Sequence, residues 1–237
     1  MSEFFAAFIN SVLEDGYVWV VLTFVVFFIA DNIYQKTKND FISALFITYI
    51  VISGLFLFID VDYEKYTRNM SVFTSFLGPA TTALAIPLYR NYQILKENFA
   101  GIMAGIFAGS FMSLVFTFAM AKVFVINHEI FISLMPKNVT LAMGLGMLEI
   151  YGGMSAILVV GVAMSGNVGM MIVPWLCKVF KITHPVAQGV AFGTSAHAMG
   201  TTKAIQMGDV QGAISGLAIG ICGVMTVIML PAFAALY

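Results

Sequence analysis

The chain has 237 residues, of which 60% are hydrophobic and only 10% are charged, and its formal net charge at pH 7 is −1. Its mean hydropathy of +0.96 excludes an ordinary soluble domain. We therefore expect an all-α membrane protein that crosses the bilayer several times. The basic residues are scattered, which excludes the charge pattern of a nucleic-acid-binding protein. The two cysteines, Cys177 and Cys222, lack metal or redox spacing and are expected in the core.

The N-terminal part predicts two membrane segments. The first runs from Tyr17 to Tyr34, after a short amphipathic stretch around Phe4 to Leu13, and the second runs from Phe41 to Ile59. A charged loop, residues 60–69, follows them. No lysine or arginine precedes Lys36, so the basic region of a cleaved signal peptide is missing and the first segment is expected in the mature protein.

Two of the next segments differ sharply in regularity. Ser71–Tyr92 contains Gly78-Pro79 and Pro87, which remove backbone donors and predict a broken helix. Phe99–Val125 is a clean apolar span. Its glycines recur at every fourth position, as do those of the last segment, Val210–Leu236, and such spacing is typical of close helix packing. The two glycine sets are Gly101, Gly105 and Gly109, and Gly212, Gly216 and Gly220.

A segment at Ile130–Ile150 is interrupted by the polar cluster Pro136–Thr140. If every segment crossed the membrane, Lys178 and Lys181 would lie outside, although lysine-rich short loops stay cytoplasmic. A re-entrant hairpin that turns at Pro136–Thr140 removes this conflict. It puts these two lysines on the same side as the other basic loop residues, which are Lys36, Lys38, Arg90 and Lys96.

Two further segments bring the total to seven or eight. Met154–Phe180 passes through Ser165-Gly166-Asn167, and Pro185–Met207 contains the polar stretch Gly193–Lys203. Polar groups and glycine-freed backbone are tolerated at membrane depth only where protein or a wet cavity satisfies them. Whether the fifth and seventh segments cross the membrane or fold back stays open at this stage.

The chain also carries a candidate internal repeat, which includes broken helices. A shift of about 57 positions pairs Pro79 with Pro136 and Gly109 with Gly166, and a shift of about 111 pairs the two glycine sets. Carriers built from inverted or parallel repeats place discontinuous helices at a central site. The sequence does not decide between the two orientations.

Three interrupted segments supply polar groups at membrane depth. Broken helices leave free N–H groups that favour anions, and Lys137 and Lys203 add positive charge. This combination predicts a binding site for a small anion such as a carboxylate, because hydroxyl and amide groups orient what a lysine attracts. The candidate substrate-binding residues are Thr81, Thr82, Lys137, Asn138, Thr140, Asn167, Ser195, His197, Thr201, Thr202 and Lys203.

Each candidate also has a structural interpretation. Lys137 fits a side chain that reaches back to the interface, and Lys203 fits a pair with Asp209. His197 fits either a proton carrier or a hydrogen-bonded core histidine. The threonines fit hydroxyls bonded to their own helices, and Asn167 fits a bridge between two helices.

Coupling and catalysis rest on few residues. Glu149 is the sole acid between Glu129 and Asp209 and fits a coupling group for H⁺ or Na⁺, but the short loop before Gly152-Gly153 explains it better. Ser195 and His197 lack an acid partner, and no phosphate loop, nucleophile elbow or metal-ligand spacing is present in the sequence. We therefore expect neither an enzyme nor a resident cofactor or metal.

Three motifs resemble the LrgB/CidB family of bacterial membrane proteins. They are residues 78–89, GPATTALAIPLY, residues 134–140, LMPKNVT, and residues 193–204, and the run 212–218 resembles the family's closing helix. The resemblance covers the chain from about Phe76 onward. It implies one LrgB-like transmembrane domain over residues 1–237, with N-terminal spans in 1–70 and the family core in 71–237.

The chain departs from the family pattern at positions that the motifs make prominent. Asn138 replaces a serine, Leu141-Ala142 replaces a threonine and a proline, and Lys203 stands where the family usually has arginine. A lysine loses the bidentate grip of arginine on a carboxylate. If these positions contact the substrate, the differences predict that the ligand or the geometry of its binding site differs from that of other family members.

The resemblance implies two functions. Members are commonly labelled antiholin-like and linked to murein hydrolase export and autolysis, with a small LrgA/CidA-type membrane partner. Other members are linked to transport of pyruvate, or of glycolate and glycerate in a plastid relative. Lysines, a histidine and proline-broken segments at membrane depth favour a carrier in a bacterial cell membrane, and the glycine faces favour homo-oligomers or a partner.

Overall fold

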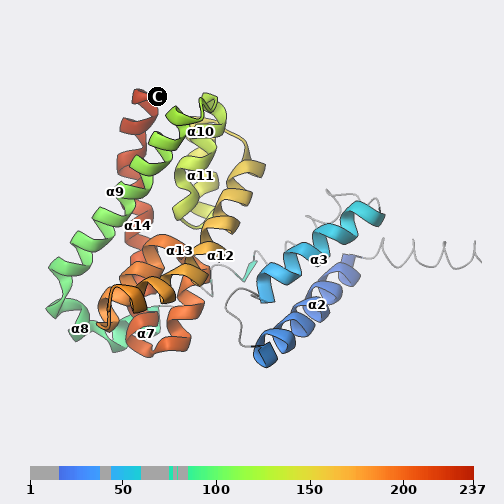
Figure 1. Ribbon diagram of the computed structural model, residues 1–237, viewed down its shortest axis with the longest axis horizontal. Coiled ribbons are helices and arrows are strands. Elements are labelled where there is room, and N and C mark those ends of the chain that lie inside the picture. The colour runs from blue at the N-terminus through green and yellow to red at the C-terminus, as the bar shows by residue number, and fades with distance from the viewer. Residues whose placement is uncertain (1–15, 38–43, 60–74, 77–78, 80–84) are drawn as a thin grey trace, which may run out of the picture. The chain divides into compact units, whose positions relative to one another are not determined.

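The computed structural model describes residues 16–37, 44–59, 75–76, 79 and 85–237 (Figure 1). All regular secondary structure in these ranges is helical, which confirms the all-α prediction. The chain forms two compact units, Met1–Ala83 and Leu84–Tyr237, and each is described by itself. The predicted amphipathic stretch Phe4–Leu13 and the charged loop 60–69 lie outside the described residues, as do Thr81 and Thr82.

The first unit contains a pair of apolar helices, α2 (Gly16–Thr37) and α3 (Ala44–Ile59). Trp19 of α2 is buried and stacks on Phe56 of α3, with ring centroids 5.3 Å apart. The hydroxyl of Thr48 donates to a carbonyl of its own helix, as threonines in apolar helices do. α3 lies within the second predicted segment, whereas α2 covers the first predicted segment and extends beyond it at both ends.

The second unit begins with two short helices and continues with longer ones. Its elements are α7 (Ala85–Arg90), α8 (Tyr92–Glu97), α9 (Phe99–Val123), α10 (His128–Leu134), the 3₁₀ turn η1 (Met135–Asn138), α11 (Leu141–Tyr151), α12 (Ser155–Val179), α13 (Pro185–Met207) and α14 (Asp209–Leu236). In the second unit, α9, α12 and α14 are long and apolar enough to cross a membrane; in the first, Val18–Thr37 is. The predicted total of seven or eight segments stays a prediction.

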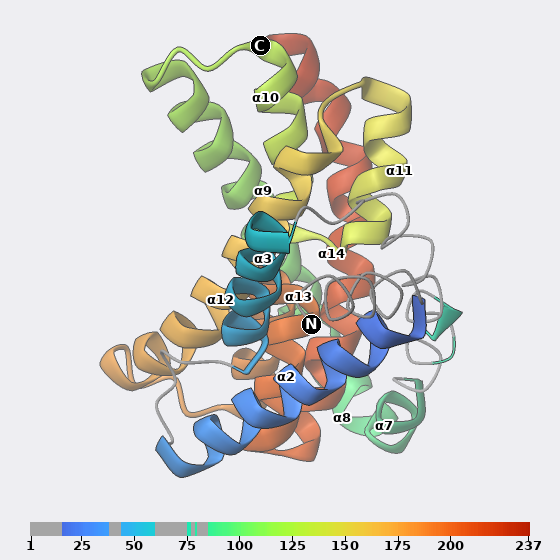
Figure 2. The same cartoon turned by 90° about the vertical axis from the view of Figure 1, so that its right-hand side faces the viewer.

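The three long helices of the second unit define its two ends. Figures 1 and 2 show α10 and α11 beside the C-terminal end of α14, whereas α7, α8 and α13 lie at the opposite end. Because α9 starts next to α8 and α12 ends next to α13, the basic residues of α8 and of the α12 C-terminus share one end of the unit. They are Lys96, Lys178 and Lys181.

An aromatic cluster lies at the end of the second unit where α9 ends. Tyr237 stacks on the buried Phe131 of α10 with ring centroids 4.0 Å apart, and Lys122 lies 4.2 Å above the Tyr237 ring. The Tyr237 hydroxyl donates to the carbonyls of Ala121 and Ile126. These contacts tie the turn between α9 and α10 to the end of α14.

The predicted glycine faces pack mainly inside the protein. A Cβ on Gly105 or Gly109 of α9 would lie 3.1 to 3.3 Å from side chains of α13, and one on Gly212 of α14 would lie 2.6 Å from Ile205. Gly101 and Gly220 have no such neighbour within 4 Å in the described part of the chain. Close packing is therefore confirmed at these three positions, but its partners are helices of the same chain.

Candidate functional site

The fifth predicted segment is a hairpin, which we call hairpin one (α10, η1 and α11). Pro136 lies in η1 and Val139 is extended, so the helix stops, and α11 restarts after Thr140, whose hydroxyl caps the Met143 N–H at 3.4 Å. Ser133, in the last turn of α10, accepts a hydrogen bond of 2.7 Å from the N–H of Met154, which follows α11. The chain therefore returns to α10 after α11, and the predicted turn at Pro136–Thr140 is confirmed.

The seventh predicted segment is a second hairpin, hairpin two, formed by α13. His197 has φ 40° and ψ −127°, and it separates the arms 185–196 and 198–207. A Cβ on Gly200 would lie 2.7 Å from the carbonyl oxygen of Phe192. Eight residues of a straight helix rise about 12 Å, so the arms must fold back on each other.

The two ends of hairpin two lie beside the start of α14. Gln211 of α14 donates to the Gln188 side chain in the first arm at 3.2 Å, and Gly212 packs against Ile205 of the second arm. Hairpin two therefore enters the unit from the end opposite to hairpin one (Figures 1 and 2).

The tips of the hairpins meet at the middle of α12. The Ser165 hydroxyl donates to the carbonyl of Lys137 in hairpin one at 2.7 Å and lies 3.4 Å from Nε2 of His197 in hairpin two. The same Nε2 lies 3.1 Å from the carbonyl oxygen of Val162. Because a carbonyl only accepts, Nε2 carries a hydrogen and donates to Val162.

A second contact between the tips lies at α14. The buried thiol of Cys222 lies 3.7 Å from the carbonyl of Asn138 and 4.0 Å from that of Thr194, one from each hairpin. The Ser110 hydroxyl of α9 donates to the Cys222 sulfur at 3.2 Å. Both cysteines are buried, as predicted.

Lys137 is the cation of this junction. Its side chain is partly buried, and its ammonium donates to the hydroxyl of Thr117 in α9. Among the described residues no carboxylate pairs with it, so donor capacity of the ammonium stays open to an anion. The alternative interpretation has Lys137 reaching the membrane–water interface. In the structure its side chain is directed at the buried Thr117 of α9 instead.

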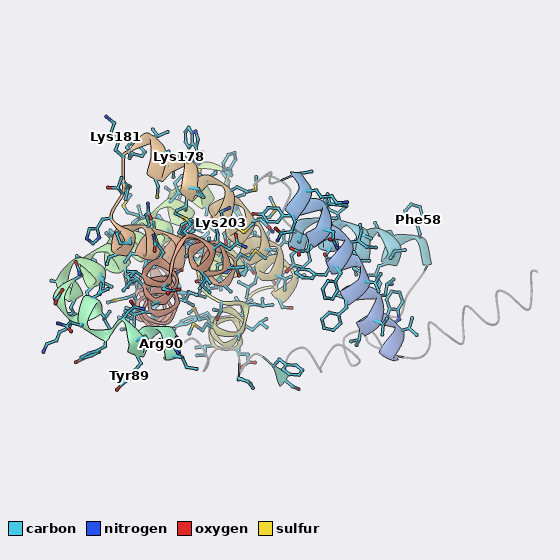
Figure 3. The ribbon with its side chains drawn as sticks, turned by 90° about the horizontal axis from the view of Figure 1, so that it is seen from below. Phe58, Tyr89, Arg90, Lys178, Lys181 and Lys203 are labelled. Atoms are coloured by element: carbon cyan, nitrogen blue, oxygen red, sulfur yellow. The ribbon has the colours of Figure 1, made fainter. Side chains whose placement is uncertain are left out.

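The other predicted residues of hairpin two are less central. The Thr201 hydroxyl contacts that of Ser215 at 2.7 Å, and Ser195 and Thr202 donate to carbonyls of their own arms. Lys203 is partly buried on the second arm, six residues beyond His197, and Figure 3 shows it inward of Lys178 and Lys181.

The remaining candidates are distributed over α11 and α12. Asn167 is buried, and its amide donates to the Ala163 carbonyl of α12 at 2.9 Å. Glu149 is exposed in the last turn of α11, far along the chain from the tip of hairpin one. Thr140 is a helix cap. In the described ranges, three or more His, Cys, Asp or Glu side chains do not gather where they could hold a metal ion.

Sequence reasoning did not include Ser110, Thr117 and Ser165 among the site residues. Ser110 and Thr117 are seven residues apart, which places both hydroxyls on one face of α9. That spacing was a usable signal, because these hydroxyls mark the strip of an apolar helix that faces the hairpins. Ser165 carried a weaker signal, its position beside Gly166.

Comparison with known proteins identifies the family. The model of the LrgB-like family matches residues 23–236. The chain belongs to the LrgB family. It is 34% identical to the uncharacterized protein YwbG of Bacillus subtilis (strain 168) over 91% of this chain and 96% of that protein. It is 33% identical to the antiholin-like protein LrgB of the same organism, over 93% and 96%. No solved structure matches the chain significantly.

The family match clarifies what the motifs do. It extends further toward the N-terminus than the part from Phe76 onward on which the resemblance rested. The antiholin-like protein LrgB of Bacillus cereus (strain B4264) is 30% identical over 92% of this chain and 95% of that protein. In this LrgB-family protein the motif 134–140 contains the turn of hairpin one, and the motif 193–204 contains the turn of hairpin two.

Proposed function

We propose that this LrgB-family protein is a secondary carrier, or the main subunit of one, for a small monocarboxylate such as pyruvate, glycolate or glycerate. The observation that carries the proposal is the junction of two oppositely directed hairpins beside the ammonium of Lys137. Carriers bind substrates at mid-depth between discontinuous helices. A regulator without a substrate gives no reason for a partly buried cation at such a junction.

The helix ends at the junction support an anion as the substrate. The N-terminus of α11 follows directly on the tip of hairpin one, where free N–H groups carry partial positive charge. Lys137 adds a full charge, and the nearby hydroxyl of Thr117 suits an oxygen of a carboxylate. Lys203 and Thr202 line the second arm below the junction and extend the candidate substrate path.

The order of elements supports an inverted repeat. The span α9 precedes hairpin one, and the span α12 precedes hairpin two, with the second pair entering from the opposite end. α9 begins at Phe99 and α12 at Ser155, 56 residues later, which agrees with the shift of about 57 in the sequence. We propose that the protein is a multi-pass protein of the bacterial cell membrane, with the basic residues of α8 and the α12 C-terminus in the cytoplasm.

Uptake into proteoliposomes tests the carrier. The purified protein is reconstituted with and without its small LrgA/CidA-type partner, and entry of labelled pyruvate, lactate, glycolate and glycerate is measured. We expect saturable uptake of at least one of them. Absence of uptake for all four, in both preparations, contradicts the proposal. Imposed H⁺ and Na⁺ gradients in the same vesicles test coupling, for which His197 is the proton-carrying candidate and Glu149 the weaker one.

The names of the relatives favour a second function, an antiholin-like regulator of murein hydrolase export and autolysis. Under this proposal the protein acts on the small partner, and it does so irrespective of carboxylates. Dye release from liposomes that contain only the small partner would change when this chain is added. Deletion of the gene would alter autolysis in cells that are independent of carboxylate exchange.

A further inference from the structure

Ser165 contacts both hairpins with a single hydroxyl. Its hydrogen is directed to the Lys137 carbonyl at 2.7 Å, and its oxygen faces Nε2 of His197 at 3.4 Å. Nε2 already carries a hydrogen, because it donates to the carbonyl of Val162. The Ser165 hydroxyl therefore bonds hairpin one through its hydrogen, which also faces the Val162 carbonyl of its own helix at 3.1 Å, and it contacts the tip of hairpin two through its oxygen. A serine fits this position because its hydroxyl donates and accepts at once.

The neighbours of Ser165 hold hairpin two tightly against α12. A Cβ on Gly166 would lie 2.8 Å from Cε1 of His197, and one on Gly169 would lie 2.6 Å from the Cβ of Ala196. The tip of hairpin two therefore rests on the backbone of α12 and moves with it. Hairpin one also approaches α12 at a glycine, because a Cβ on Gly161 would lie 3.2 Å from Leu134. One turn further along α12, Ser165 adds a polar contact to the same hairpin.

We propose that Ser165 is a positioning residue that couples the tips of the two hairpins, so that breaking its hydrogen bond to hairpin one makes separation of the tips easier. The inference rests on the proposed carrier for its transport consequence, but the coupling is a property of the folded protein alone. In the carrier, Ser165 sets the rate of the conformational step and leaves substrate affinity nearly unchanged. The group touches no substrate.

Cys222 provides a reporter that does not depend on transport. Its sulfur is fully buried between the carbonyls of Asn138 and Thr194, on the α14 side of the same junction. In a Cys177→Ala background it is the sole cysteine, since the chain has two. Alkylation by N-ethylmaleimide then requires the tips to separate, and mass spectrometry measures its rate.

The test compares Ser165→Ala with Ser133→Ala, a matched control. Ser133 lies in the last turn of α10, and its hydroxyl donates to the Glu129 carbonyl and accepts from the Met154 N–H, both at 2.7 Å, so its loss leaves the contact between the two hairpin tips intact. We expect Ser165→Ala to raise the alkylation rate about fivefold, the effect of losing a hydrogen bond of ordinary strength, and Ser133→Ala to leave it unchanged. Ser165→Thr, which keeps the hydroxyl, should restore the slow rate. Equal rates for the two alanine variants overturn the proposal.

A second variant removes the His197 side of the contact between Ser165 and His197. His197→Phe keeps a ring but removes Nε2, so it should also speed alkylation of Cys222, and adding Ser165→Ala to it should have little further effect. Additive effects contradict a single link. If Ser165→Ala fails to fold, His197→Phe alone tests the coupling of the two hairpin tips.

Transport completes the test and separates the two proposals. In proteoliposomes Ser165→Ala should lower the maximal rate about fivefold with the half-saturating concentration within about twofold. If the wild-type protein carries none of the four acids but Ser165→Ala still accelerates alkylation, the carrier fails and the coupling stands. If uptake is normal and neither rate nor alkylation responds to Ser165→Ala, the carrier stands and the coupling fails.

Discussion

The two hairpins arrive at one junction by different turns. Hairpin one needs several residues, Pro136 in a 3₁₀ turn and Val139 in extended conformation, and all of them have negative φ. Hairpin two turns at the single residue His197, whose φ of 40° is rare for a residue with a side chain. The first turn follows from local chemistry, whereas the second is imposed by the contacts of His197 with α12.

The hairpins also differ in how they are held. Hairpin two packs through glycines, with Gly193 against Ala218 of α14 and Gly169 of α12 against Ala196. The tip of hairpin one approaches α12 at Gly161, where a Cβ would lie 3.2 Å from Leu134, but it is held in addition by the polar side chains Thr117 and Ser165. The difference indicates that the tip of hairpin one depends more on side-chain hydrogen bonds than hairpin two does.

The largest effect is expected from filling the glycine contact of hairpin two. A Cβ at Gly193 would lie 2.6 Å from the Cβ of Ala218, so Gly193→Val should destabilise the protein by about 3 kcal/mol or more. Thermal midpoint and monodisperse yield in detergent measure this. Gly220→Val is the control, because it meets no atom within 4 Å in the described chain. Equal midpoints for the two variants would mean that hairpin two is not packed in this way.

The next effect separates the two lysines. Removing one partner of a hydrogen-bonded charge pair costs about 2–5 kcal/mol, so loss of the partly buried Lys137 ammonium in Lys137→Met should lower carboxylate uptake about 30-fold, while the midpoint changes little. Lys203→Met, on the arm of hairpin two, should lower it less. The same uptake assay measures both variants. A larger loss for Lys203→Met would place the anion along hairpin two rather than at the junction.

A smaller effect isolates the strained turn. Glycine normally destabilises a helix relative to alanine, but at φ 40° the preference is reversed. His197→Gly should therefore be about 1 kcal/mol more stable than His197→Ala, which is measured by comparing thermal midpoints. Ala198→Gly, one residue into the second arm, should show the ordinary loss. If His197→Ala is the more stable variant, the backbone at this position is not strained.

The smallest effect compares the bases of the hairpins. Tyr237→Phe keeps the stack on Phe131 but removes the hydroxyl that binds the turn before hairpin one, which should cost about 1 kcal/mol. Gln188→Leu removes the bond to Gln211 at the base of hairpin two and should cost about half as much, since hydrogen bonds between membrane helices average roughly 0.6 kcal/mol. Thermal midpoints rank the two. The reverse order would make hairpin two the more dependent on polar contacts.

The sequence predicts hairpin one better than hairpin two for a physical reason. A proline and a polar cluster in an apolar segment stop a helix wherever they stand, so the turn at Pro136–Thr140 can be predicted from these residues alone. His197 is not a turn residue, and its backbone conformation depends on Val162 and Gly166, which are some thirty residues away. The polar stretch was visible in the sequence, but its turning point was not.

The candidate site was predictable to a similar extent. Lys137 was found because a cation in an apolar segment is costly wherever it lies. Ser165 was missed because a single hydroxyl on an apolar helix usually bonds its own backbone, and the fold shows that this one also reaches a neighbouring element. Thr117 was missed although its spacing from Ser110 marks one face of α9. The distance between Lys137 and Lys203 depends on how both hairpins fold, so composition and spacing do not determine it.

The packing of hairpin two also sets an order of assembly. A ribosome makes α13 before α14, yet Gly189 of α13 fits against Gln211 and Ile214, and Gly193 fits against Ala218, which belong to the later helix. A polar hairpin without these partners is costly in lipid, so we expect α13 to reach its final position only after α14 is inserted. The junction would then be completed last during synthesis.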